Sequence, residues 1–362
     1  MQGREPAWRE PRRPAHGARA TLGYYEKVSG ACKAETLPVN NDFVQLAWDA
    51  RLQDDCRQLV RLALREDLDR SFDWTTVALV PADAEGAALL VARAAGVVAG
   101  LLAIPVVLSE MDSSIVFTPY VAEGTAVAPG GQLARLQGPA RDLLTAERVL
   151  LNFVGHLSGI ATLTRRYVEA IAGTGAQIYD TRKTTPGWRR LEKYAVGRGG
   201  GRNHRSGLCE ALMIKDNHLA FGAASPSGSR YSPAEAVAIA RQFVEQMTPE
   251  TPGPRMLIEV EVDRLEQLDE VLLADPDIVL LDNMDHEQLR AAVQRRNTLR
   301  PAIPLEASGG VRLESVRAIA ETGVDRISVG ALTHSAAALD VALDWLAPSA
   351  GGHSAATRTR DA

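Results

Sequence analysis

The sequence predicts an α/β protein in which a small α+β domain precedes a parallel sheet, either closed into a barrel or doubly wound. Two features lead to this fold class. Short apolar runs alternate with helical patterns through the second half of the chain, as in repeated βα units. In the first half, residues 87–138 alternate short apolar runs with Gly and Pro, which indicates strands with a helix between them.

Helices are expected on either side of these early strands. Apolar spacing over residues 42–64 predicts one or two helices, and residues 141–172 form a long helix with one buried face. The most apolar run, residues 94–108, contains Gly and Pro and is shorter than the ~18 residues of a membrane span. We therefore expect a buried strand–turn–helix there.

The second half of the chain supplies the strands and helices of the parallel sheet. The expected strands are residues 177–181, 211–214, 256–262, 278–281, 304–307 and 326–329. The expected helices are residues 234–247, 265–274, 287–296, 313–321 and 335–346. In α/β barrels the catalytic groups lie at the C-terminal ends of the strands, and the loops after the last two strands often bind phosphate.

Charged residues and glycines occur where these strands end. In chain order they are Arg182 and Lys183, Lys215, Glu261, Asp282, then Ser308, Gly309 and Gly310, and last Gly330, Ala331 and Leu332. Glycine-rich turns that open helices offer backbone amides and the positive end of a helix dipole to phosphate. A structural explanation stays open for Glu261: it could be an edge-strand charge, because Glu259 and Glu261 alternate with Val260 and Val262 and so share one strand face. His218 and His334 could also be structural, and no paired His or Cys spacing suggests zinc.

A run of basic residues interrupts a chain whose net charge is -5. Between Thr181 and Cys209 it comprises Arg182, Lys183, Arg189, Arg190, Lys193, Arg198, Arg202 and Arg205, with His204 among them and Glu192 as the single acid. A solvated basic face is the ordinary explanation. However, Pro186-Gly187 and the glycines at 199–201 break the segment into loops, and the basic residues do not share one helical spacing. A concave site of one charge sign attracts the opposite charge, so we expect a polyanionic ligand.

Several long motifs in this stretch resemble the quinolinate phosphoribosyltransferase family. They are residues 180–187 (Asp-Thr-Arg-Lys-Thr-Thr-Pro-Gly), 191–196 (Leu-Glu-Lys-Tyr-Ala-Val), 203–205 (Asn-His-Arg) and 214–218 (Ile-Lys-Asp-Asn-His), with 146–153 and 157–162 upstream. The resemblance covers roughly residues 54–346 and is specific because several motifs keep their order.

The resemblance implies an incomplete parallel α/β barrel with fewer strands than the standard one. It implies transfer of phosphoribosyl from 5-phosphoribosyl 1-pyrophosphate to quinolinate with decarboxylation, which gives nicotinate mononucleotide, pyrophosphate and CO2 in NAD biosynthesis. Mg²⁺ is the implied cofactor. The implied assembly is a homodimer with shared active sites, or a higher oligomer.

Particular residues acquire roles from the same resemblance. Quinolinate carries two carboxylates, and Arg suits a bidentate grip on each. The implied substrate-binding residues are Arg182, His204 and Arg205, with Lys183 and Lys215 beside them as catalytic groups. Arg148 matches an arginine that, in the family, enters the active site of the partner subunit, so it is also an implied substrate-binding residue. Glu261 and Asp282 would act in catalysis and hold Mg²⁺, directly or through water or substrate. The loops at 308–310 and 330–332 would hold the 5-phosphate.

Two other functions stay compatible with the residues. One is a related phosphoribosyltransferase acting on another small anion, and the other is a Schiff-base α/β-barrel enzyme that uses Lys215 or Lys183. The sequence pI of about 5.9 counts against a nucleic-acid-binding protein. Three cysteines, an odd and sparse set, fit a reducing cytoplasm better than a disulfide framework.

The chain is expected to divide at three boundaries. Residues 1–41 are rich in Arg, Pro, Gly and Ala and are expected to be a disordered extension. Residues 42–158 form the α+β domain with its linking helix, and residues 159–348 form the barrel, whose last helix could pack on the first domain. Residues 349–362 form a flexible tail, and residues 223–232, rich in Ser and Gly, form an inserted loop.

Overall fold

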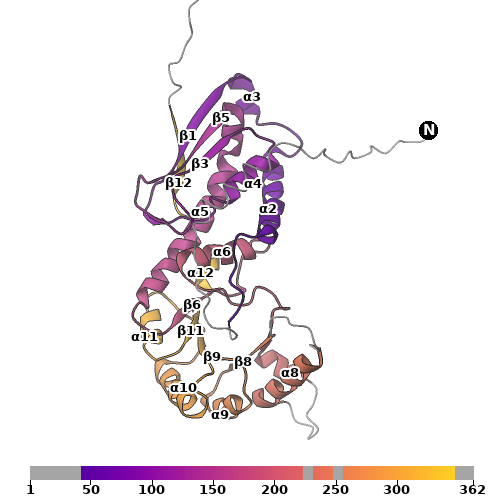
Figure 1. The fold of residues 1–362 in the computed structure, drawn as a ribbon, viewed down its shortest axis with the longest axis vertical. Coiled ribbons are helices and arrows are strands. Elements are labelled where there is room, and N and C mark those ends of the chain that lie inside the picture. The colour runs from indigo at the N-terminus through magenta and orange to yellow at the C-terminus, as the bar shows by residue number, and fades with distance from the viewer. Residues whose placement is uncertain (1–41, 223–230, 248–255, 347–362) are drawn as a thin grey trace, which may run out of the picture.

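The computed structural model describes residues 42–222, 231–247 and 256–346, arranged as two parts joined by one long helix (Figure 1). An antiparallel sheet lies at one end, a parallel sheet with outer helices lies at the other, and α5 (Ala140–Ala170) runs between them. The expected extension 1–41, the tail 349–362 and residues 223–230 of the expected loop lie outside the described residues.

The N-terminal part is an antiparallel sheet covered by helices, in the strand order β12-β1-β5-β3. Its elements are α2 (Ala50–Leu68), α3 (Trp74–Leu79), β1 (Glu85–Ala92), β2 (Gly96–Val97), α4 (Ala103–Glu110), β3 (Val116–Pro119), β4 (Ala126–Val127), β5 (Gln132–Pro139) and β12 (Val341–Trp345). Asp49 caps α2, because its Oδ1 accepts a hydrogen bond from the Leu52 amide at 2.7 Å. Leu52, Cys56 and Val60, four residues apart, give this helix its buried stripe.

Residues 42–49 were expected to be helical and are not. They run in an extended path from α2 down to the parallel sheet, where the Leu46 amide donates to Asn203 Oδ1 at 2.8 Å. Phe43 on this segment stacks against His204, with ring centroids 4.3 Å apart. Phe43 is thus buried by a distant part of the chain, which sequence spacing cannot reveal, while its neighbour Val44 stays exposed.

The prediction of a helix over residues 335–346 is wrong. α12 (Ala331–His334) ends early, and the chain continues as β12, which pairs antiparallel with β1 in the N-terminal sheet. The reason lies in α5: a Cβ on Gly159 would come within 2.1 Å of the Ala337 oxygen, so glycine lets this segment lie directly on the helix. The segment is thereby led to the free edge of β1, and a strand forms although the apolar spacing also fits a helix.

The C-terminal part is a six-stranded parallel sheet in the order β6-β11-β10-β9-β8-β7. Its strands are β6 (Gln177–Tyr179), β7 (Ala211–Ile214), β8 (Leu257–Val262), β9 (Ile278–Asp282), β10 (Leu305–Ser308) and β11 (Arg326–Ser328). Within the described ranges β6 and β7 occupy opposite edges, so the barrel is incomplete, as the family resemblance implies. The free edge of β6 bonds instead to the Arg202 segment, through Arg202 N to Ile178 O at 2.8 Å and Asp180 N to Arg202 O at 3.0 Å.

Helices α8 (Pro233–Met247), α9 (Leu265–Leu273), α10 (His286–Leu299) and α11 (Val316–Ala320) follow the strands much as expected, although α11 is shorter than residues 313–321. Short α7 (Asp216–Phe221) follows β7. The basic run differs more, because residues expected as loops form α6 (Arg189–Gly199). Its buried stripe of Leu191, Tyr194 and Ala195 determines the helix, whereas the spacing of the basic residues alone did not suggest one.

Candidate active site

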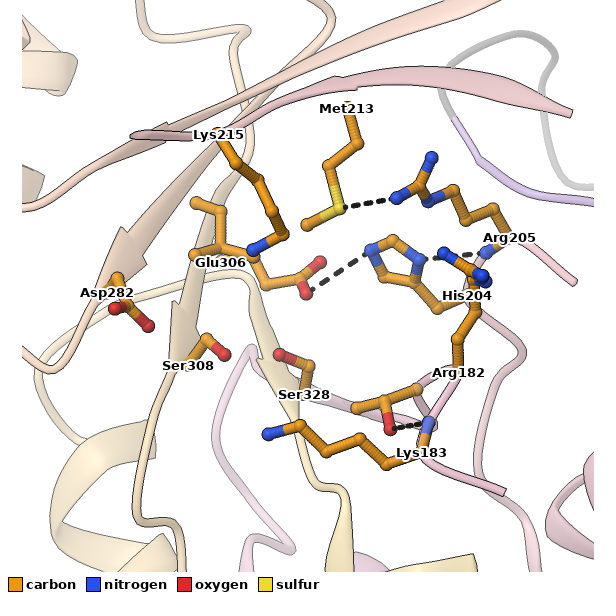
Figure 2. Close-up of a pocket in the computed structure, with 12 residues that line it drawn as sticks. Arg182, Lys183, His204, Arg205, Met213, Lys215, Asp282, Glu306, Ser308 and Ser328 are labelled. Atoms are coloured by element: carbon orange, nitrogen blue, oxygen red, sulfur yellow. Dashed lines mark hydrogen bonds and ion pairs between the residues drawn. The ribbon is translucent and has the colours of Figure 1, made fainter. Parts of the chain in front are cut away.

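A cavity of about 330 Å³ opens at the carboxyl ends of the parallel strands (Figure 2). Its lining is Thr181, Arg182, Lys183, His204, Arg205, Met213, Lys215, Leu280, Asp282, Glu306, Ser308 and Ser328. Seven of the fourteen predicted site residues therefore line it, at or just after the ends of β6, β7, β9 and β10 and in the 202–205 segment. Figure 2 shows lysines and arginines around the rim with Glu306 between them.

The mouth of the cavity carries paired charges. Lys215 Nζ forms an ion pair with Glu261, which extends from β8 beside it. Burial raises the pKa of Glu261, and nearby Asp282 adds to this, while Lys215 opposes both. The side chain of Asp282 accepts a hydrogen bond from Asn283 Nδ2 at 2.7 Å. Two carboxylates thus stand at the ends of neighbouring strands.

A fully buried network holds the segment that carries His204. Asp180 pairs with Lys193 and accepts hydrogen bonds from Asn203 Nδ2 and the His204 amide, each at 2.8 Å. Lys193 Nζ also donates to the His204 carbonyl at 2.8 Å. Burial raises the pKa of Asp180 and lowers that of Lys193 despite their pairing. Burying these two charges costs desolvation free energy, and their hydrogen bonds fix the position of the segment that carries His204.

Beneath the mouth, the predicted residue His204 meets two acids that received no role from the sequence, Glu259 and Glu306. His204 Nε2 is 3.0 Å from Glu259 Oε2 and 3.5 Å from Glu306 Oε1. His204 Nδ1 accepts the Arg205 amide at 2.8 Å, so both ring nitrogens are engaged within the protein. The three side chains are close enough to share a metal ion, but Nε2 must carry a proton toward Glu259, which disfavours that use.

The basic run has two uses. Arg182, Lys183 and Arg205 line the cavity, but the other five basic residues bind the protein itself. Lys193 is in the buried network, Arg190 pairs with Asp55, Arg202 pairs with Asp42, Arg189 bonds Thr184 and the Ser206 carbonyl, and Arg198 lies over the Tyr194 ring. The acid Glu192 is buried and pairs with His156. The expectation of one polyanion site therefore applies to only part of the run.

The expected phosphate loops lie beside the cavity. Gly309 and Gly310 have φ of 99° and 58°, and a Cβ on Gly309 would lie 2.1 Å from Asn283 Oδ1, so glycine is required there. α11 begins only at Val316, so residues 308–310 do not open a helix directly as expected. Gly330, next to Ala331 and Leu332 at the start of α12, lies against Lys183, whose carbonyl accepts from Thr333 Oγ1 at 2.7 Å.

Arg148 lies away from this cavity in its own chain. It projects from α5 into a second cavity of about 610 Å³ that also contains Asn152, His156, Trp188 and Asp340. A single chain therefore does not bring Arg148 to the strand mouth, whereas the other predicted cations lie there.

Some lining residues were missed by sequence reasoning, namely Thr181, Met213, Leu280, Glu306 and Ser328. A usable signal existed for Glu306, because residues two apart on a strand share a face and Glu306 precedes Ser308 by two. The same rule relates Glu259 to Glu261 on β8. Across the described ranges no helix has both the length and the apolar character needed to cross a membrane.

Comparisons with known proteins match nearly all of the described chain. The family model described as quinolinate phosphoribosyl transferase, C-terminal domain, matches residues 160–344, and the corresponding N-terminal domain model matches residues 73–158. The nicotinate-nucleotide pyrophosphorylase (carboxylating) of Mycobacterium leprae is 46% identical over 293 residues, which cover 80% of this chain and 97% of the relative. A probable enzyme of the same name from Bacillus subtilis is 42% identical over 256 residues, covering 70% and 82%.

Solved structures agree with the sequence matches. The nicotinate-nucleotide pyrophosphorylase of Francisella tularensis superposes with a TM-score of 0.73 at 34% identity, over 85% of this chain and all (100%) of that one. The corresponding structure from Ehrlichia chaffeensis gives a TM-score of 0.69 at 33% identity, over 84% and 100%. Both the small antiparallel domain and the six-stranded barrel are therefore shared.

Proposed function

Because the chain belongs to the quinolinate phosphoribosyltransferase family, we propose that it transfers phosphoribosyl from 5-phosphoribosyl 1-pyrophosphate to quinolinate. The reaction releases pyrophosphate and CO2 and gives nicotinate mononucleotide for NAD biosynthesis. One observation of the structure supports it above others: cations that follow β6 and β7, and cations of the 202–205 segment, converge on one cavity at the strand ends. Such a site suits a dicarboxylate and a pyrophosphate together.

Arg182 and Arg205 would bind the two carboxylates of quinolinate. The Arg182 Nε is buried and, within the described ranges, has no hydrogen-bond acceptor, so a ligand carboxylate would satisfy it. Arg205 is held by the Ala211 carbonyl at 3.3 Å and by Met213 Sδ at 3.2 Å, which fixes its guanidinium. His204 would contact the substrate through its ring and align Arg205 through the hydrogen bond that the Arg205 amide donates to Nδ1.

Lys183 and Lys215 would stabilise the charge that develops on the departing pyrophosphate. The Lys215 side chain is only 38% exposed and is paired with Glu261, so its ammonium group is already positioned at the site. The pyrophosphate would replace Glu261 as its partner. The glycines at 308–310 and 330–332 would hold the 5-phosphate beside them, because their backbone can approach a ligand closely. Decarboxylation would follow transfer, since the cationic ring nitrogen formed by transfer accepts electrons.

We further propose Mg²⁺ as the cofactor, held by Glu261 and Asp282 either directly or through water or substrate. Oxygen ligands at two neighbouring strand ends fit a hard cation. When bound, Mg²⁺ would neutralise part of the pyrophosphate charge. The chain's own residues would then orient the ribose between the carboxylates and the phosphate loops.

A homodimer is the proposed assembly. Arg148 faces a separate cavity in its own chain, and a dicarboxylate site gains from a further cation supplied across an interface. We propose that Arg148 of one subunit completes the site of the other. We also place the enzyme in the cytoplasm, since the described Cys56 and Cys209 are both free thiols.

A product assay tests the function. Purified protein is incubated with quinolinate, 5-phosphoribosyl 1-pyrophosphate and Mg²⁺, and nicotinate mononucleotide, pyrophosphate and CO2 are measured together. We expect the three products in equal amounts, and little product when nicotinate replaces quinolinate. Equal turnover of nicotinate would instead identify a phosphoribosyltransferase for another small acid.

A further inference from the structure

Two acids, Glu259 and Glu306, lie below the mouth of a cavity that is otherwise built for anions. Both are fully buried, and Glu306 also lines the cavity from β10. Figure 2 shows its carboxyl group between Lys215 and His204, with Ser328 beside it. A second buried negative charge here would repel a dicarboxylate substrate, so the state of Glu306 needs an explanation.

The bonds of His204 decide where the protons of this group reside. The Arg205 amide donates to Nδ1 at 2.8 Å, so the ring proton is on Nε2, which faces Glu259 Oε2 at 3.0 Å. Burial opposes a charged ring, and although Glu259 and Glu306 together raise the pKa of His204, a second ring proton would have to sit on Nδ1. The Arg205 amide occupies that position. The extra proton therefore belongs on Glu306, 3.5 Å from Nε2.

The surroundings of Glu306 agree with a neutral carboxylic acid. The pKa of Glu306 is raised to about 7: burial is the largest cause and Glu259 adds to it, while His204, Arg326 and the Ser328 hydroxyl act in the opposite direction. These groups face it from β8, from β11 and from the 202–205 segment. Neither Glu306 oxygen makes a well-formed hydrogen bond in the part of the chain that the structure describes, although Ser328 is close enough to interact. The carboxyl proton of Glu306 therefore has no well-formed hydrogen bond to a protein acceptor among the described residues.

The proposed reaction has a step that requires a proton, and the inference rests on that reaction. After the ring nitrogen bonds to the ribose, the bond between C2 and its carboxylate breaks, and the electron pair remains on C2 beside the cationic nitrogen. Release of nicotinate mononucleotide requires a proton on C2. Arginines do not give up a proton, and Lys183 and Lys215 already have a proposed role at the departing pyrophosphate.

We propose that Glu306, in its neutral form, is the general acid that gives its proton to C2 as CO2 leaves. The O–H bond of Glu306 breaks, its electron pair stays on the carboxyl oxygen, and a C2–H bond forms. The resulting carboxylate takes a proton from solvent before the next turnover. Because Glu306 is neutral before the step, it does not repel the incoming dicarboxylate.

The main test is E306Q. Glutamine keeps the shape and neutrality of the acid but has no proton to transfer. We expect KM for both substrates to change less than about threefold and kcat to fall about 10²-fold or more, within the range usual for general acids. A kcat within about twofold of the wild type would overturn the proposal. Circular dichroism and titration with 5-phosphoribosyl 1-pyrophosphate confirm that the variant is folded.

The pH profile gives an independent readout. Only the protonated acid can act, so wild-type kcat should fall as pH rises through about 7. E306Q should lack that decline. If the decline persists in E306Q, it belongs to another group, such as Glu261 with its own raised pKa, and the proposal is wrong.

A second variant covers the case in which E306Q does not fold. Glu259 raises the pKa of Glu306, so E259Q should move the decline in kcat to lower pH, and an unmoved decline would contradict the proposal. A wild type that forms no nicotinate mononucleotide would overturn both the function and this assignment. An active wild type with an equally active E306Q would overturn the assignment alone.

Discussion

Asp180 and Arg182 stand two residues apart after β6, yet they belong to different kinds of region. Asp180 is fully buried and meets Lys193, Asn203 and the His204 amide, so its charge is satisfied by the chain. Arg182 faces the cavity, and its buried Nε finds no acceptor in the described residues. The first region is a scaffold and the second is prepared for a ligand.

The difference shows how to interpret a run of like charges. Five of the eight basic residues between Thr181 and Cys209 have partners inside the protein, and such residues should matter for stability. Among the cavity residues, Arg182 has a buried Nε without an acceptor in the described ranges, so its charge should matter for ligand binding. The comparison would fail if a variant of an internally paired residue changed only ligand binding, or if a variant of a cavity residue changed only stability.

The largest expected effect is on the scaffold. Lys193→Met leaves the Asp180 carboxylate buried without its counter-charge, and breaking a buried pair in this way costs about 3–5 kcal/mol. We expect that loss in the free energy of unfolding from urea denaturation. The control Glu321→Ala removes an exposed ion pair with Arg317 and should cost less than about 0.5 kcal/mol. Equal losses in the two variants would contradict the scaffold role.

The next effect is on ligand binding. Arg182→Ala should weaken quinolinate binding by about 1.5–3 kcal/mol, because one charged hydrogen-bond partner is lost, while 5-phosphoribosyl 1-pyrophosphate binds nearly as before. Calorimetry measures both affinities. Arg190→Ala removes the same charge from the same run but from a residue paired with Asp55, so it should leave quinolinate affinity unchanged. Unchanged affinity in Arg182→Ala would remove that residue from the acid site.

The metal ranks third. EDTA should abolish activity and Mg²⁺ should restore it, and Asp282→Asn should raise the Mg²⁺ concentration needed for half activity about tenfold, equivalent to about 1.4 kcal/mol. Asp285→Asn is a suitable control, because Asp285 caps α10 three residues further on and does not line the cavity. Full turnover in EDTA would show that the carboxylates act without a metal.

The sequence was sufficient for the local patterns and insufficient for the long-range ones. Strand ends at Lys215 and Asp282 could be predicted, because apolar runs end there and parallel strands share an edge. The strand β12 could not, because its partner β1 lies some 250 residues away in sequence and the apolar spacing also fits a helix. The Glu306 environment combines β8, β10, β11 and the 202–205 segment, and no single stretch contains it.

The smallest signal concerns the shared site, and it needs the most careful design. Arg148→Ala and Arg182→Ala should each be nearly inactive alone. In a mixed dimer, one site would carry both lesions and the other would carry neither, if Arg148 acts across the interface. About half of the dimers in an equal random mixture are mixed, so roughly a quarter of all sites should recover under two-fold symmetry. Activity is measured after subunit exchange has been verified with differently tagged chains, with each single variant exchanged against itself as the control. Absence of recovery would place Arg148 in its own subunit's site or outside the chemistry, because each site of the mixed dimer would then carry one lesion.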